Sequence, residues 1–345
     1  MRRFAIYFAI ANLIGIFFLW LAAKELPFGK ILDFLGTYDR VTFLTWALVF
    51  CALYGVSHLA RVVRWYELVR SLDDEKELIS KSRSAAICAI GFMSILLLPL
   101  RLGEFVRPYL LSKNSEIPMS AALGTVVVER IIDGMVITGM LFITASSYAF
   151  SEQRVFALSL SAFAAAIFFP AFFMCAVALW KRELAFKIVQ KTAGLLSPSI
   201  AQKIIGMLGA FIDGFRALKN GKSLGKFLAY TAIYWISNGA SMWLLATFAF
   251  GFDVSLFDGY TLLAILVVGI MLPGGPAMAG NYEYFINRGM LLVSTTAPEG
   301  IAAFAATIHI LQFLVIVIPG MLIMAFDKSM RSIIKIANES MDAEK

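Results

Sequence analysis

Three arginines and three carboxylates within residues 101–133 form the strongest candidate for a chemical site in this chain. An ionised side chain at the centre of a bilayer costs at least about 2.5 kcal/mol, so such residues face the protein interior and mark function. The charges can neutralise one another and hold two helices together, or an arginine can bind an anionic headgroup through paired hydrogen bonds. These two uses are compatible. The six predicted site residues are Arg101, Glu104, Arg107, Glu129, Arg130 and Asp133.

Proline and glycine interrupt two apolar segments, residues 84–112 and 259–297, and we expect each to form a broken or re-entrant helical hairpin. A helix that begins inside the membrane has backbone N–H groups without partners, and its positive N-terminal end suits a phosphate. The two hairpins would enter from opposite sides and meet around one central polar cavity. They add six residues to the predicted binding site: Gly103, Pro273, Gly274, Gly275, Gly280 and Glu283.

Arg61, Arg64 and Trp65 lie at the end of the second predicted span. Arginine close to a membrane–water interface, beside tryptophan, is typical of an interfacial belt. The alternative is a mouth at which anionic lipids gather before they reach the cavity.

The composition excludes an ordinary soluble globule. Only 15% of the 345 residues are charged and 60% are hydrophobic, whereas soluble domains have about 25% charged residues. A basic face near anionic headgroups explains the net charge of +7, and we expect no nucleic-acid partner. The three cysteines lie in apolar runs and there are only two histidines, so we expect no metal site and no cofactor.

The elements that position these residues are predicted to be helices only. We expect an all-α polytopic membrane bundle with about six full spans and the two broken hairpins of opposite orientation. Residues 1–326 form a single transmembrane domain, and residues 327–345 form a short cytoplasmic tail. An amphipathic helix over residues 198–219 lies on the cytoplasmic surface. The predicted spans are 4–22, 41–60, 119–149, 155–180, 227–250 and 300–326.

The distribution of lysine and arginine predicts the orientation. Cytoplasmic segments carry an excess of these residues, so basic loops belong inside. This places both termini in the cytoplasm and requires each hairpin to return to the side on which it starts. The counts of lysine and arginine are 2, 6, 9 and 4 in segments 1–3, 61–83, 181–226 and 327–345.

Three motifs in order along the chain resemble the lysylphosphatidylglycerol synthase transmembrane-region family. They are Arg101-Leu102-Gly103-Glu104-Phe105-Val106-Arg107-Pro108, then Glu129-Arg130-Ile131-Ile132-Asp133, then Pro273-Gly274-Gly275 with Gly280-Asn281-Tyr282-Glu283. The family consists of flippase-like integral membrane proteins of bacteria and archaea. The resemblance implies a lipid-translocating module in the cytoplasmic, or inner, membrane. Two-domain members also carry a C-terminal aminoacyl-transferase domain, which we expect to be absent here because the chain stops at Lys345.

The leading hypothesis is a flippase-like transporter, not an enzyme, that moves an anionic or phosphate-bearing lipid between leaflets through a central polar cavity. One alternative is an intramembrane enzyme that modifies a lipid or polyprenyl-phosphate headgroup, with adjacent carboxylates as acid and base. Another is an accessory subunit that delivers lipid to a glycosyltransferase. The expected partners are membrane lipids, with a homo-oligomer and a separately encoded lipid-modifying enzyme as further candidates.

Overall fold

The computed structural model describes six parts of the chain, and every regular element in them is a helix. The all-α prediction is therefore confirmed for the described residues. The predicted span 4–22, Pro273-Gly274 and residues 328–345 of the predicted tail lie outside them. The described ranges are 36–72, 78–147, 152–193, 197–215, 221–272 and 275–327.

Five long helices occupy the positions of the other predicted spans. Within the described ranges, three helical stretches are apolar enough by length and composition to cross a membrane, namely α3, residues 154–180 of α7, and α13. A full count of six spans stays a prediction. The five helices are α3 (Arg40–Arg70), α6 (Met119–Ser147), α7 (Glu152–Trp180), α10 (Gly221–Leu244, followed by a π-helical turn at Leu245–Ala249) and α13 (Pro298–Phe326).

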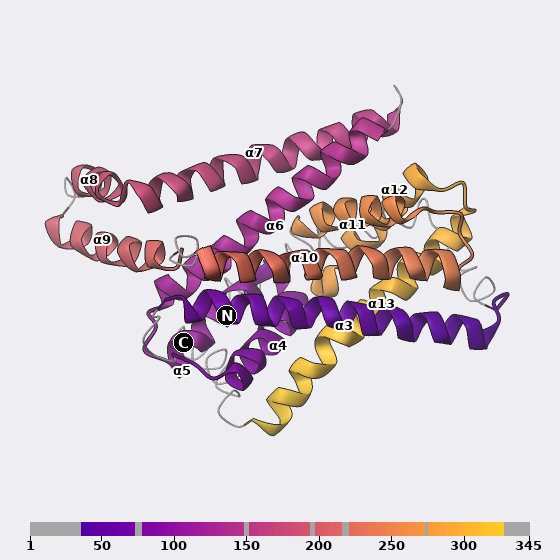
Figure 1. Cartoon of the computed structure of the whole chain (residues 1–345), viewed down its shortest axis with the longest axis horizontal. Coiled ribbons are helices and arrows are strands. Elements are labelled where there is room, and N and C mark those ends of the chain that lie inside the picture. The colour runs from indigo at the N-terminus through magenta and orange to yellow at the C-terminus, as the bar shows by residue number, and fades with distance from the viewer. Residues whose placement is uncertain are drawn as a thin grey trace, which may run out of the picture.

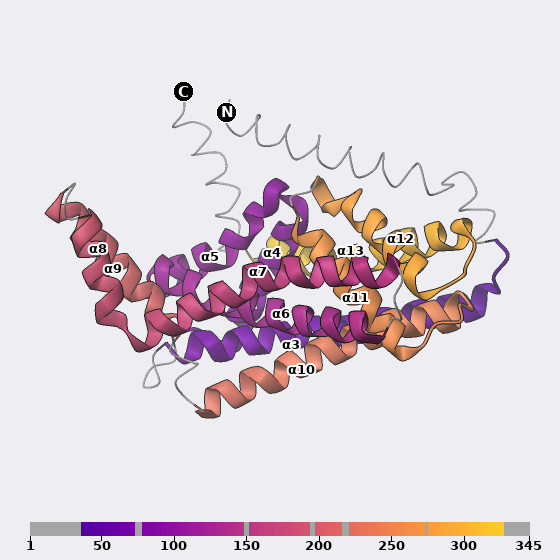
Figure 2. The same ribbon diagram turned by 90° about the horizontal axis from the view of Figure 1, so that it is seen from above.

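Helix α3 begins at a clear N-cap and extends beyond its apolar run. The Asp39 carboxylate accepts a hydrogen bond of 2.8 Å from the Thr42 N–H, which caps the helix and lowers the pKa of this exposed acid. The helix continues to Arg70, ten residues beyond the predicted span 41–60. Its added turns carry Arg61 and Arg64 into the bundle. Helices α3 and α10 lie side by side along the length of the molecule (Figures 1 and 2).

Each predicted hairpin folds as a helix, a break and a second helix. The first consists of α4 (Lys81–Leu97), a 3₁₀ turn at Pro99–Phe105 and α5 (Val106–Asn114). Helix α4 ends there because Leu98 precedes a proline and takes an extended backbone conformation. The second consists of α11 (Leu256–Met271), a short turn at Pro276–Met278 and α12 (Asn281–Val293).

The surface helix predicted over residues 198–219 is shorter than expected and packs against a second helix. Helix α9 (Pro198–Asp213) packs against α8 (Arg182–Ala193), and the pair extends from one end of the molecule (Figure 1). The turn after α9 reaches Phe215, and residues 216–220 lie outside the described part. Glycines allow α9 to approach α6, because a Cβ at Gly124 or Gly214 would meet backbone atoms of the other segment. Helix α9 is thus anchored on the bundle, while Met207 on it is 61% exposed.

Candidate functional site

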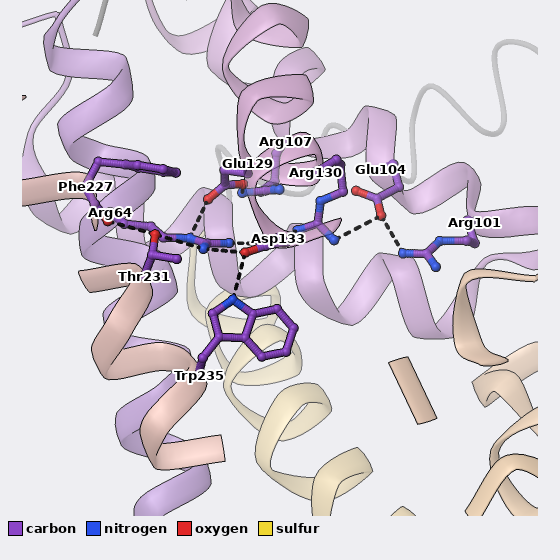
Figure 3. Close-up of polar contacts among 10 residues, drawn as sticks. All are labelled: Arg64, Arg101, Glu104, Arg107, Glu129, Arg130, Asp133, Phe227, Thr231 and Trp235. Carbon is purple, nitrogen blue, oxygen red and sulfur yellow. Dashed lines mark hydrogen bonds and ion pairs between the residues drawn. The ribbon is translucent and has the colours of Figure 1, made fainter. Parts of the chain in front are cut away.

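Arg64 lies at the centre of a buried ion-pair network that joins α3 to α6 (Figure 3). Its two Nη atoms donate to the two carboxylate oxygens of Asp133, each over 2.7 Å. Its Nε donates to Glu129 Oε1 over 3.3 Å. Glu129 and Asp133 are four residues apart on α6, so they present their carboxylates from one helical face. The Arg64 side chain is fully buried, and the paired geometry is the strongest that arginine offers a carboxylate.

Arg107 brings α5 into the same network from the other side. Its Nη1 lies 2.7 Å from Glu129 Oε2, an ion pair without the directional geometry of a hydrogen bond. The guanidinium carbon also lies 5.0 Å from the centroid of the Phe92 ring and 5.4 Å from that of Trp65. The side chain crosses α4 at Gly91, where a Cβ would collide with Arg107 Cγ. Glycine at this position is therefore required for Arg107 to reach Glu129.

Neutral side chains complete the inner network. Trp235 Nε1 donates to Asp133 Oδ1 over 3.3 Å, and Arg64 Nη1 also donates to Thr231 Oγ1 over 3.3 Å. Trp65 is fully buried and its Nε1 donates to Thr125 Oγ1 over 3.1 Å. Arg64 and Trp65 therefore do not occupy the surface position that we expected for them. Their polar partners on α6 account for their burial.

Arg101 and Glu104 form an outer pair in the break of the first hairpin. Arg101 Nη2 donates to Glu104 Oε1 over 2.8 Å, and Arg101 Nη1 donates to the carbonyl oxygen of Ile270 over 2.8 Å. Since Ile270 lies near the end of α11, this arginine connects the two hairpins. The Arg101 backbone is left-handed, with φ of 59°, and a Cβ at Gly103 would collide with the backbone of Ser94 and Ile95. The turn is thus folded back tightly on α4.

Arg130 lies between the inner and outer groups without a close partner in either. Its Nη1 is 3.8 Å from Glu104 Oε1, and its Nη2 is 3.7 Å from Asp133 Oδ2. Figure 3 shows the resulting alternating row of Arg64, Asp133, Arg130, Glu104 and Arg101. The Nε and Nη2 atoms of Arg130 are buried and have no hydrogen-bond partner in the described part of the chain.

Arg61 is a further cation beside this row, one helical turn before Arg64. Its guanidinium carbon lies 4.1 Å from the centroid of Phe92 and 5.3 Å from that of Tyr234. Among the described residues no carboxylate lies within ion-pair distance of Arg61, and its Nε has no hydrogen-bond partner. In the part of the chain that the structure describes, this charge is therefore accompanied by cation–π contacts and by no counter-charge.

A cavity of about 140 Å³ lies where these residues meet the second hairpin. Arg61, Arg101 and Arg130 line its charged side together with Asp133. Tyr282 and Met278 line it from the second hairpin, and much of the remaining wall is apolar. About 10–15 Å³ of such cavity space is enough for one water molecule, so the cavity has room for a phosphate group with some water. Arg64, Arg107, Glu129 and Glu104 are not in the lining. The inner network therefore reaches the cavity through Asp133, and Arg61, Arg101 and Arg130 are the outer arginines that face it.

Glu283 does not join the arginines but pairs with His309 of α13. The His309 Nδ1 is 2.6 Å from Glu283 Oε1, and Glu283 Oε2 accepts a hydrogen bond of 2.7 Å from the Gly280 N–H. The His309 Nε2 lies 2.7 Å from the carbonyl oxygen of Ala277. The second turn is held in left-handed conformations, with φ of 57° at Ala277 and 88° at Gly280. His309 and its ring partner Tyr282, stacked at 4.2 Å, both line the cavity.

Most of the predicted site residues therefore come together, and the second hairpin contributes differently from our expectation. Gly275 is buried before the short turn, whereas Pro273 and Gly274 lie outside the described residues. In the described ranges, no group of three or more histidine, cysteine, aspartate or glutamate side chains is arranged to hold a metal ion. The residues gathered in the network and its outer row are Arg61, Arg64, Arg101, Glu104, Arg107, Glu129, Arg130 and Asp133.

An all-helical bundle with long apolar helices and a charged interior defines this protein as an integral membrane protein. The chain belongs to the lysylphosphatidylglycerol synthase TM region family, whose family model matches residues 6–320. The resemblance of its three motifs is thereby confirmed. No curated protein and no solved structure matches the chain.

Proposed function

We propose that this protein is a flippase-like transporter, and not an enzyme, for an anionic or phosphate-bearing lipid. The carrying observation is the cavity in which Arg61, Arg101 and Arg130 face one space from three different elements. Guanidinium groups are well suited to phosphate because their planar N–H donors match its oxygens in pairs. A phosphate headgroup would occupy the cavity while the acyl chains remain in the surrounding bilayer.

The two broken hairpins support transport in particular. Transporters commonly bind their substrates near the midplane, where interrupted helices meet. Here the Arg101 hydrogen bond to Ile270 links the first hairpin to the end of α11 in the second. In our proposal both hairpins are re-entrant, with opposite orientations, in the cytoplasmic membrane of a bacterium or archaeon, and both chain termini are cytoplasmic. Relative movement of the hairpins would open the cavity to one leaflet and then to the other.

The test is lipid translocation in proteoliposomes with the double variant Arg101→Ala/Glu104→Ala. This change removes one positive and one negative group, so the total charge of the site is unchanged. We expect translocation of a labelled anionic phospholipid to fall at least about tenfold, which is about 1.4 kcal/mol. Arg182→Ala/Asp213→Ala is the matched control, because it removes an exposed ion pair between α8 and the end of α9. Equal rates for both folded double variants and the unchanged protein would contradict the proposal.

An intramembrane enzyme is the second candidate, and the His309–Glu283 pair is the observation that favours it. A carboxylate 2.6 Å from an imidazole at a cavity is an arrangement that general acid–base catalysis uses. Mass spectrometry of membrane lipids separates the two functions. Chemically new lipids that appear with the protein and disappear with His309→Gln would favour the enzyme. An unchanged lipid inventory with an altered distribution between leaflets would favour the transporter.

A further inference from the structure

The charges of the site do not balance. Within the described residues, the arginine network and the charged side of the cavity together contain five guanidinium groups and three carboxylates, an excess of two positive charges. His309, which also lines the cavity, pairs with Glu283, and both of its ring nitrogens face acceptor oxygens, so this pair is counted as neutral. The arginines are Arg61, Arg64, Arg101, Arg107 and Arg130, and the acids are Glu104, Glu129 and Asp133. A partly buried charge without a counter-charge is costly inside a membrane protein, so the excess calls for an anion.

The excess is located at the cavity and not in the inner network. Arg64 and Arg107 are fully buried against Glu129 and Asp133, whose side chains are 1% and 9% exposed, so this inner group is neutral by itself. That leaves Arg61, Arg101 and Arg130 with the single carboxylate of Glu104. All three of these arginines line the cavity. The two positive charges in excess therefore face the space in which a ligand would bind.

The hydrogen-bonding groups of the outer arginines are also incompletely used. Arg61 Nε and Arg130 Nε and Nη2 are buried and have no hydrogen-bond partner in the described segments. Leaving a buried donor unpaired costs free energy, and a charged donor costs more. Glu104 does not line the cavity, and its carboxylate offsets the charge of Arg101 and Arg130 from outside the lining. A group with several acceptor oxygens would satisfy these arginine donors together.

We infer that the cavity selects a lipid that ends in a doubly charged phosphate group, a phosphate monoester or a diphosphate. This inference rests on the proposed lipid transport and specifies its substrate class. A phosphate monoester carries about −1.5 to −2 charges at neutral pH because its second pKa is about 6. It neutralises the excess that the five arginines leave, whereas a phosphodiester with one charge leaves one arginine uncompensated. A zwitterionic headgroup has no net charge, so it leaves both excess positive charges uncompensated.

Calorimetric titration of the full chain in neutral detergent tests the inference with two short-chain lipids. Dihexanoyl phosphatidate ends in a monoester, and dihexanoyl phosphatidylmethanol has the same phosphate capped by one methyl group. At about pH 8 the first carries close to two negative charges and the second carries one. We expect phosphatidate to bind about tenfold more tightly, which is about 1.4 kcal/mol. At about pH 5 both lipids carry one charge, and the difference should nearly vanish.

Two variants should move this preference in opposite directions. Arg61→Gln lowers the excess to one charge and strands no carboxylate, so we expect the advantage of phosphatidate to shrink. Glu104→Gln raises the excess to three positive charges, and the glutamine amide oxygen can still accept the hydrogen bond from Arg101. We therefore expect the advantage of phosphatidate to grow. Arg40→Gln is the control, because it removes an exposed arginine from the first turn of the same helix, α3. The Arg40→Gln variant should prefer phosphatidate over phosphatidylmethanol as strongly as the unchanged protein does.

The outcomes separate the inference from the proposed function. Equal affinity for the two lipids at about pH 8 would overturn the inference and leave lipid binding intact. Inorganic phosphate that binds as tightly as phosphatidate would support the doubly charged ligand and contradict the lipid as its source. These affinities are measured on the unchanged protein, so they test the inference even if a variant does not fold.

Discussion

Arg64 and Asp133 are joined by two parallel hydrogen bonds of 2.7 Å although they lie 69 residues apart in the chain. This pair fixes α3 against α6 in the interior of the bundle. It also orients the α6 face from which Arg130 reaches the cavity. The inner network is therefore the framework on which the outer arginines are held. Disruption of the inner network should lower the stability of the protein and, as a consequence, weaken ligand binding.

Arg64→Ala should destabilise the protein strongly, because Asp133 and Glu129 then keep their charges without this partner. Breaking a buried pair by removing one member costs about 3–5 kcal/mol. Thermal unfolding in detergent measures the change in Tm. Arg182→Ala removes one member of an ion pair whose side chains are 43% and 50% exposed, and such pairs contribute about 1 kcal/mol or less. A drop for Arg64→Ala no larger than for Arg182→Ala would show that the buried network does not stabilise the fold.

Gly91→Ala should displace Arg107, because the added methyl group occupies the place of the Arg107 side chain. Forcing an extra methyl group into a packed interior costs about 1–3 kcal/mol. Gly55→Ala is the matched control on α3, since nothing lies within 4 Å of its added Cβ. Alanine is favoured over glycine inside a helix by about 1 kcal/mol, so the control should be neutral or stabilising. Opposite signs of the two changes in Tm are the expected result, and equal changes would contradict the close approach of Arg107 to α4.

Glu283→Gln should be tolerated, whereas Glu283→Leu should not. Glutamine retains an oxygen for the Gly280 N–H and an amide for His309, but leucine leaves both groups unpaired. Each buried group without a partner costs about 1–3 kcal/mol. Thermal unfolding of the two variants therefore should show a small shift for glutamine and a clear loss for leucine. If both variants lose the same stability, the charge of Glu283 matters rather than its hydrogen bonds.

The proposed re-entrant course of the first hairpin can be tested through its topology. Ser82 and Glu116 flank the first hairpin on exposed positions, and both should lie on the cytoplasmic side. In a variant without Cys51, Cys88 and Cys175, single cysteines at these positions should react with an impermeant maleimide only after the membrane is opened. Thr295→Cys, after the second hairpin, should react in intact cells. Labelling of positions 82 and 116 from opposite sides would show that the first hairpin crosses the membrane.

Local patterns in the sequence predicted much of this arrangement. Helices occupy all five predicted spans that fall within the described residues, and both proline–glycine breaks separate helices. The spacing of Glu129 and Asp133 correctly indicated one helical face, since both bind Arg64. These features depend on neighbours within a few residues, and for that reason they can be recognised from sequence alone.

Long-range pairing could not be recognised in the same way. Arg64 follows an apolar run and precedes a tryptophan, which is the usual pattern of a membrane interface. Its partners lie 65 and 69 residues away, and only the packing of α3 on α6 brings them together. The same holds for His309, which lies within an apolar run and contacts Glu283 26 residues earlier. Buried pairing also explains why α3 continues past its apolar stretch.

A structure of the chain with dihexanoyl phosphatidate bound would show whether the outer arginines hold the phosphate. We expect the phosphate in the central cavity, within hydrogen-bonding distance of Arg61, Arg101 and Arg130, with the inner pair of Arg64 and Asp133 unchanged. A phosphate bound elsewhere, with these three arginines still facing a cavity that contains no lipid, would contradict this expectation.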